Sequence, residues 1–114
     1  MTTTEKRSGS IPPAEPQRFA DLVDFQDGSI VSRTVAASKA GTLTLFAFDE
    51  GQSLSEHSAP YDAYVTVLEG VGELVIDGKS VTTKAGETVL MPGNIPHSVH
   101  ADERFKMLLI MIRG

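Results

Sequence analysis

The chain has 114 residues, of which 40% are hydrophobic and 22% are charged, as in an ordinary globular domain with one core. A net charge of −5 disfavours nucleic-acid and anionic-membrane partners, and the absence of cysteine excludes disulfide scaffolds, thiolate nucleophiles and cysteine zinc sites. No apolar stretch approaches the roughly 20 residues of a membrane span, and no signal-peptide core is present, so we expect a cytoplasmic protein with no membrane partner.

The N-terminal part of the chain is expected to lie outside the main domain. Residues 1–17 are mainly Thr, Ser, Pro and charged residues with almost nothing to bury, which predicts a flexible tail. Residues 18–29 carry Phe19, Leu22, Val23 and Phe25 at roughly helical spacing. This segment is predicted to pack on the edge of the domain, either as a short helix or in an extended form.

From Ile30 onward the sequence consists of short runs rich in β-branched and aromatic residues, which are separated by Gly, Asp and Pro. The runs cover residues 30–38, 42–48, 64–70, 72–77, 80–84, 88–91, 97–101 and 104–113. Their spacing predicts one all-β domain, a barrel or a sandwich, over residues 30–114. The last run is apolar on both faces, as expected of a strand that is covered on both sides or used at a subunit interface.

Two series of residues keep fixed spacings: Gly51, His57, Ala63 and Gly70 in the first, and Gly86, Pro92, Asn94 and His97 in the second. These spacings resemble the two signatures of the small single-domain cupin family, and the resemblance covers residues 40–112. Asn94 occupies a glycine slot, and Asn is the non-glycine residue best suited to left-handed backbone. The resemblance implies a cupin barrel, which is a double-stranded β-helix or jelly roll.

Cupins that bind metal usually present three His and one Glu to an Fe, Mn, Ni or Zn ion inside the barrel. In this chain His57 and His97 keep two of these slots, whereas Ala59 and Ala63 occupy the other two. Zinc prefers four ligands, and non-haem iron takes at least three from the protein, so we expect at most a loosely held divalent ion (Zn, Ni, Mn or Fe) on the two histidines. Glu56, Tyr61 or Asp62 could swing in to complete the set. In the alternative interpretation, the histidines line a pocket that holds no metal.

Strand alternation places the side chains of Ala63, Val65 and Val67 inside the barrel if His57 also faces inward. The predicted small-molecule pocket is lined by His57, Ala59, Tyr61, Ala63, Val65, Met91 and His97. The alternative is a packed core in which this space is filled by Phe46, Phe48, Met91, Phe105 and Met107.

Two further polar residues lie near the histidines in the sequence. Asp62 is the candidate catalytic residue, either as a base or as a group that orients His57, and its alternative role is a turn residue after Pro60. His100 lies three residues after His97, so on a strand it points to the opposite face and is expected at the surface.

We therefore expect a cupin-fold protein that binds a small molecule, with a loosely held divalent metal on His57 and His97. The alternative is a metal-dependent enzyme of the dioxygenase, isomerase or lyase type, and a structural dimer without a pocket is a third interpretation. Outward-facing apolar residues need a cover, which favours a homodimer. These residues are Tyr64, Leu68, Leu108, Ile110 and Ile112.

Overall fold

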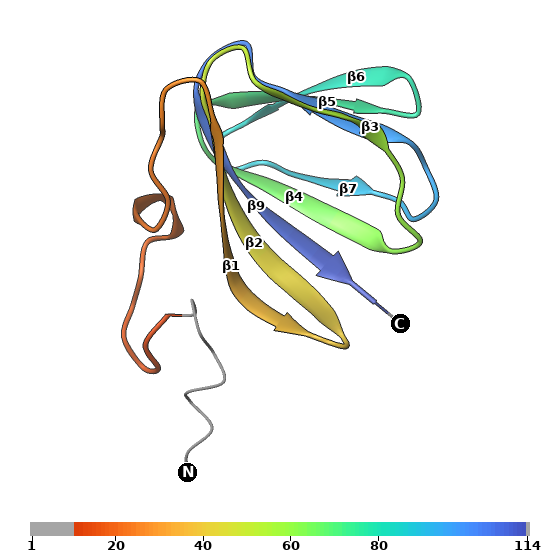
Figure 1. Cartoon of the computed structure of the whole chain (residues 1–114). Coiled ribbons are helices and arrows are strands. Elements are labelled where there is room, and N and C mark those ends of the chain that lie inside the picture. The colour runs from red at the N-terminus through yellow and green to blue at the C-terminus, as the bar shows by residue number, and fades with distance from the viewer. Residues whose placement is uncertain (1–10, 114) are drawn as a thin grey trace.

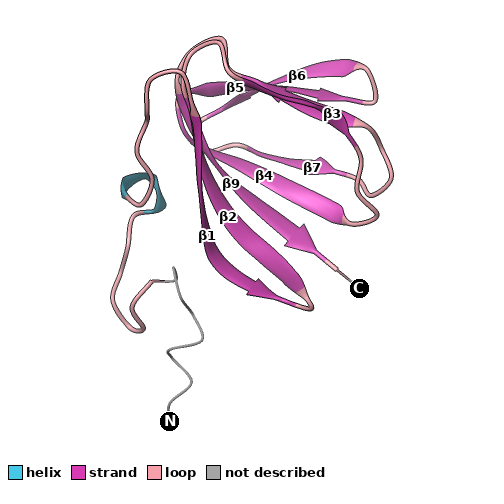
Figure 2. Cartoon of the chain, viewed as in Figure 1, coloured by secondary structure: helices cyan, strands magenta, loops and turns pink. Residues whose placement is uncertain are grey.

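The computed structural model describes residues 11–113, so residues 1–10 of the expected flexible tail lie outside the described part of the chain. The described residues form nine β-strands, and their one helix is a single 3₁₀ turn, η2 (Phe19–Asp21) (Figure 2). The strands are β1 (Ile30–Ser38), β2 (Gly41–Phe48), β3 (Ser53–His57), β4 (Asp62–Glu69), β5 (Val71–Ile76), β6 (Lys79–Lys84), β7 (Thr88–Met91), β8 (His97–His100) and β9 (Phe105–Ile112). The all-β prediction is confirmed. No helix in this part of the chain is long and apolar enough to cross a membrane.

The strands form two antiparallel sheets that face each other (Figure 1). The five-stranded sheet has the order β1-β2-β9-β4-β7, and the four-stranded sheet has the order β3-β8-β5-β6. From β3 onward the chain passes repeatedly between the two sheets, which is the jelly-roll arrangement that the family resemblance implies. Strands β3, β7 and β9 finish at one end of the barrel, where β4 and β8 begin (Figure 1).

Strand β3 is not among the runs that the sequence analysis identifies. Its side chains are exposed except for the half-buried Leu54, so it lacks the apolar alternation of the other strands. It lies at the edge of the four-stranded sheet and pairs with β8. Polar and charged side chains are common on edge strands, because they discourage pairing with another chain.

The main core lies between the two sheets. Phe48 and Phe105 are fully buried there, with ring centroids 4.7 Å apart and an interplanar angle of 12°. Val65 and Val67 are also fully buried, as alternation predicts for the inner face of β4. Gly72 lies under the Phe105 ring, and a Cβ atom on Gly72 would approach that ring to 2.6 Å. Strand β5 therefore needs glycine at this position.

A second apolar cluster covers the outer face of the five-stranded sheet. Val23 of the N-terminal segment is buried against Leu45, Ala47 and Leu108, and Figure 1 shows this segment running along the sheet. Leu108, Leu68 and Ile110 are among the outward-facing apolar residues predicted to need a cover. In the structure the chain's own N-terminal segment supplies this part of their cover. The single turn η2 is the only helical part of residues 18–29, and the rest of the segment consists of bends, turns and loop.

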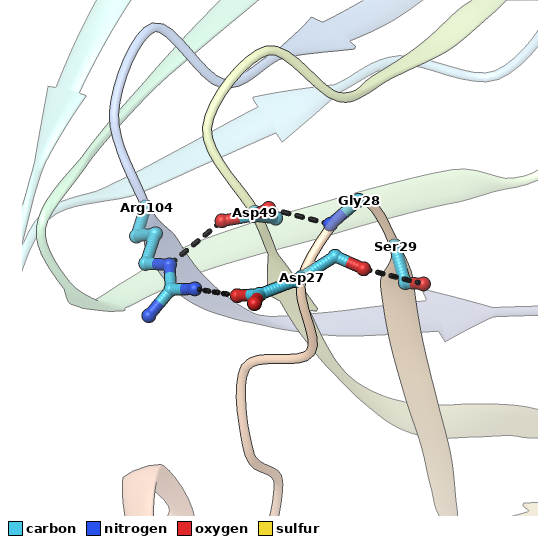
Figure 3. Close-up of polar contacts among 5 residues, drawn as sticks. All are labelled: Asp27, Gly28, Ser29, Asp49 and Arg104. Atoms are coloured by element: carbon cyan, nitrogen blue, oxygen red, sulfur yellow. Dashed lines mark hydrogen bonds and ion pairs between the residues drawn. The ribbon is translucent and has the colours of Figure 1, made fainter.

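Polar contacts hold the end of the N-terminal segment to the barrel (Figure 3). The Arg104 guanidinium donates from Nη2 to Asp27 Oδ1 at 2.6 Å and from Nε to Asp49 Oδ1 at 2.7 Å. The other oxygen of Asp49 accepts the Gly28 N–H at 2.6 Å. The Gly28 N–H and the Arg104 guanidinium together lower the pKa of the Asp49 carboxyl below its ordinary value. Lys106 adds a bond from Nζ to the Ala20 carbonyl at 2.6 Å.

Candidate functional site

His57 and His97 face each other at one end of the barrel, which we call the histidine end. His57 is the last residue of β3 and His97 is the first residue of β8, and the two are paired in the strand register. Their Nε2 atoms lie 3.2 Å apart, and their ring planes are inclined at 71°. His97 is 6% exposed, whereas His57 is open to solvent. The two histidines that the family spacing singles out therefore form one site.

A β-bulge in β3 brings the two rings together. Leu54 pairs with Val99, and a regular register would then place Glu56 opposite His97. The register instead shifts between Leu54 and His57, so His57 takes that position. An extra residue in one strand redirects the side chains that follow it, and bulges of this kind occur next to functional sites.

Backbone carbonyls determine which ring nitrogen carries hydrogen. His57 Nδ1 lies 2.9 Å from the Ser55 carbonyl oxygen, and His97 Nδ1 lies 3.1 Å from the Ile95 carbonyl oxygen. A carbonyl oxygen can only accept, so both Nδ1 atoms donate and both Nε2 atoms carry a lone pair when the rings are neutral. Burial lowers the pKa of His97, and the proximity of His57 lowers it further, against an opposing effect of the Ile95 carbonyl. Two lone pairs that face each other at 3.2 Å repel unless a positive charge lies between them.

The nitrogen spacing fits two ligands of one metal ion. Two imidazole nitrogens at about 2.0–2.1 Å from a tetrahedral zinc ion are about 3.4 Å apart. The described residues supply only these two metal-ligating nitrogens, because residues 11–113 contain no group of three or more His, Cys, Asp or Glu that could hold an ion. Glu56 and Asp62 are therefore not placed to complete a metal site in this conformation. Water or a bound ligand would have to supply the other donors.

Asp62 lies apart from the histidine pair. Its Oδ1 atom accepts the Gly93 N–H at 2.9 Å, and its side chain is exposed. Asp62 precedes the inward-facing Ala63 on β4, so alternation directs it to the outer face of the sheet. The bond to Gly93 is the kind of contact expected of a turn residue, and the catalytic role of Asp62 stays a prediction.

The remaining residues of the predicted pocket divide into two groups. Ala63, Val65 and Met91 are at most 4% exposed and belong to the core between the sheets. Ala59 and Tyr61 lie in the loop that leads into β4, where the Ala59 carbonyl accepts the Asn94 N–H at 2.6 Å. Asn94 has a φ of 66°, the left-handed conformation expected for its glycine slot.

Arg113 is not among the site residues predicted from the sequence. Its guanidinium carbon lies 5.3 Å from the centroid of the Tyr61 ring, and its Nη1 atom donates to the Ser38 carbonyl at 3.3 Å. The alternation of side chains on β9, continued past Ile112, would have predicted that Arg113 faces inward.

His100 bonds Ser98 Oγ through Nε2 at 2.9 Å. It lies on the face opposite His97, as expected, although it is half-buried.

Comparisons with known proteins agree with this fold. The model of the cupin domain family matches residues 44–112. A conserved protein of unknown function from Streptococcus pyogenes is 34% identical, with a TM-score of 0.87 and 92% of each chain covered. A cupin 2 conserved barrel domain protein from Leptotrichia buccalis is 45% identical, with a TM-score of 0.80 over 82% of this chain, which spans only 46% of that longer protein.

A more distant structure shares the fold alone. Salicylate 1,2-dioxygenase from Pseudaminobacter salicylatoxidans is 14% identical, with a TM-score of 0.68 over 75% of this chain and 26% of the dioxygenase. No curated protein matches the chain. The jelly-roll topology, the histidine pair at one end of the barrel and the match over residues 44–112 together show that this chain belongs to the cupin domain family.

Proposed function

We propose that this cupin binds a small molecule at the histidine end, where His57 and His97 together hold a divalent metal ion loosely. The observation that carries the proposal is the pair of Nε2 atoms, which face each other at 3.2 Å while both Nδ1 atoms donate to backbone carbonyls. Metal ligands commonly donate their second ring N–H in this way, which orients the ring and makes the ligating nitrogen more basic. The lowered pKa of His97 keeps that ring neutral near pH 7, as metal binding requires.

With two protein ligands, the site leaves coordination positions for a bound molecule. An ion held there would act as a Lewis acid toward an oxygen atom of that molecule. The Ser55 and Ile95 carbonyls fix the orientation of the two imidazoles. The lack of a carboxylate ligand leaves the ion's charge uncompensated, which favours weak binding. The alternative remains a metal-dependent enzyme of the dioxygenase, isomerase or lyase type, in which the substrate completes the coordination.

Metal titration tests the proposal. The protein is prepared without a nickel column, stripped with chelator and titrated with zinc, manganese, iron or nickel, and the bound metal is measured by mass spectrometry. We expect one ion per chain with a weak affinity, and we expect His57→Ala combined with His97→Ala to abolish it. His100→Ala is the matched control and should bind like the wild type. Equal metal content in all three proteins would contradict the proposal.

We further propose that the protein is a homodimer that pairs through the uncovered part of the outer face. Leu90 and Ile112 are 42% and 52% exposed there, next to the half-buried Tyr64, which pairs with Leu90 in the register. The N-terminal segment covers only the neighbouring cluster around Leu45. Light scattering at increasing concentration should give twice the chain mass, and Leu90→Lys with Ile112→Lys should halve it. A monomeric wild type would refute the pairing.

A further inference from the structure

A row of uncharged, mostly apolar side chains crosses the whole outer face of the five-stranded sheet. Register pairs link one residue from each strand, and residues that pair in this way share a face. The N-terminal segment covers the neighbouring row around Leu45, so its cover ends beside this one. In strand order the row, which we call the apolar row, is Ala36, Leu43, Ile110, Tyr64 and Leu90.

The two ends of the apolar row have opposite shapes. At the β1 end, a hollow of about 290 Å³ lies between the β1–β2 hairpin and β9, and we call it the hairpin hollow. The hairpin lines it with small residues, which include Ala36, Ala40 and Gly41. At the β7 end, Leu90 stands on the outer face and is 42% exposed. One end is therefore recessed, and the other carries an exposed leucine that can fill a recess.

Opposite charges flank the apolar row on the same two sides of β9. Lys39 lies at the tip of the β1–β2 hairpin and Asp62 lies at the start of β4, and both are exposed. Neither of them forms a salt bridge with another described residue. Ile112 of β9 lies between the two sides, because Gly41 and Asp62 are its register partners. A face that carries both shapes and both charges is complementary to a second copy of itself.

We propose that two copies of the chain pack these faces together about a two-fold axis along β9, so that Leu90 of each copy enters the hairpin hollow of the other. The inference rests on the homodimer proposed above, since it assigns the surfaces that meet. β9 is the middle strand, so a rotation about it exchanges β7 with β1 and β4 with β2 (Figure 1). Leu90 then faces Ala36, and Asp62 faces the hairpin that carries Lys39. An axis along the apolar row would instead place each of these charges opposite its own copy, which is unfavourable.

Cross-linking of full chains tests the pairing, because the chain has no cysteine of its own. Leu90→Cys and Ala36→Cys are mixed, joined with a short bis-maleimide reagent and weighed by mass spectrometry. We expect the linked dimers to contain one chain of each variant, with few links between identical chains. Ser80→Cys is the matched control, because Ser80 is exposed on the outer face of the other sheet. Mixed with Leu90→Cys, it should not form links.

Two sets of variants test the hollow and the charges by analytical ultracentrifugation. Ala36→Trp fills the hairpin hollow and should weaken dimerisation at least tenfold, whereas Ser80→Trp should leave it unchanged. Ala36 is exposed on an edge strand, so we expect this variant to fold, and thermal melting checks it. Lys39→Asp should also weaken dimerisation, and adding Asp62→Lys to the same chain should restore it.

The outcomes separate this inference from the homodimer itself. In a dimeric wild type, mixed links no more frequent than those of the Ser80→Cys control overturn the inference and leave the homodimer standing. Dimerisation that a folded Ala36→Trp does not weaken has the same meaning, and the cross-links alone decide if that variant is unfolded. A monomeric wild type overturns both and leaves the metal proposal standing. If that monomer binds an apolar dye that Ala36→Trp does not bind, the hollow is assigned to a small apolar molecule instead.

Discussion

Replacing Ala63 by glutamate puts a carboxylate at the position where metal-binding cupins carry one, and the structure predicts two opposed effects. Ala63 is 4% exposed on the inner face of β4, between its register partners Met91 and Met111. The Ala63→Glu variant therefore adds one methylene group and a charged carboxylate in packed surroundings. Ala63→Gln is the matched control, because it has nearly the same shape and no charge.

The magnitudes follow from the burial of Ala63. Overpacking a core position costs about 1–3 kcal/mol, which both variants share. An unpaired buried carboxylate costs several kcal/mol more, against a total stability of about 5–15 kcal/mol for a domain. Metal-free Ala63→Glu should therefore be markedly less stable than Ala63→Gln. A bound ion compensates the charge, so zinc should bind Ala63→Glu at least about tenfold more tightly than the wild type, which is about 1.4 kcal/mol.

Urea unfolding with and without chelator measures the stability difference, and competition with a metal indicator measures the affinity. The expected result is a glutamate variant that zinc stabilises strongly, beside a glutamine variant that zinc stabilises no more than the wild type. The reasoning is refuted if the two variants unfold alike in chelator and bind zinc alike, because Ala63 would then not share a site with His57 and His97.

Three further predictions concern the core, the pH response and the N-terminal segment. Phe48→Ala removes the ring stacked on Phe105 and should lower the free energy of unfolding by about 3–5 kcal/mol; a loss below 1 kcal/mol in urea would contradict the packing. Because the pKa of His97 is lowered in the folded state, the metal-free protein should be most stable above pH 6.5 and lose stability as the pH falls below it. His97→Gln should flatten the melting temperature over that range, and an unchanged slope would argue against the prediction. Arg104→Gln should speed amide exchange around Phe25 and leave the core protected, whereas unchanged exchange would show that the contacts to Arg104 do not hold this segment.

Local patterns predicted the fold and part of the site. The inward positions Val65 and Val67 followed from alternation, because side chains on a strand have a period of two. The left-handed Asn94 followed from its glycine slot. Strand β3 was not predicted, because its side chains are mostly polar and exposed and no local apolar pattern distinguishes it from a loop.

The sequence by itself determined that this is an all-β domain with two histidines at the spacing of a cupin metal site and two alanines in place of further ligands. Only the tertiary structure decided how those residues act. The bulge in β3 brings His57 opposite His97, and the Ser55 and Ile95 carbonyls place the hydrogen of each neutral ring on Nδ1. Likewise, only the folded chain shows that the Arg113 guanidinium packs against the Tyr61 ring and that its Nε atom is buried without a hydrogen-bond partner. Strand register and the partners of a buried donor depend on segments distant in sequence, so no local pattern encodes them.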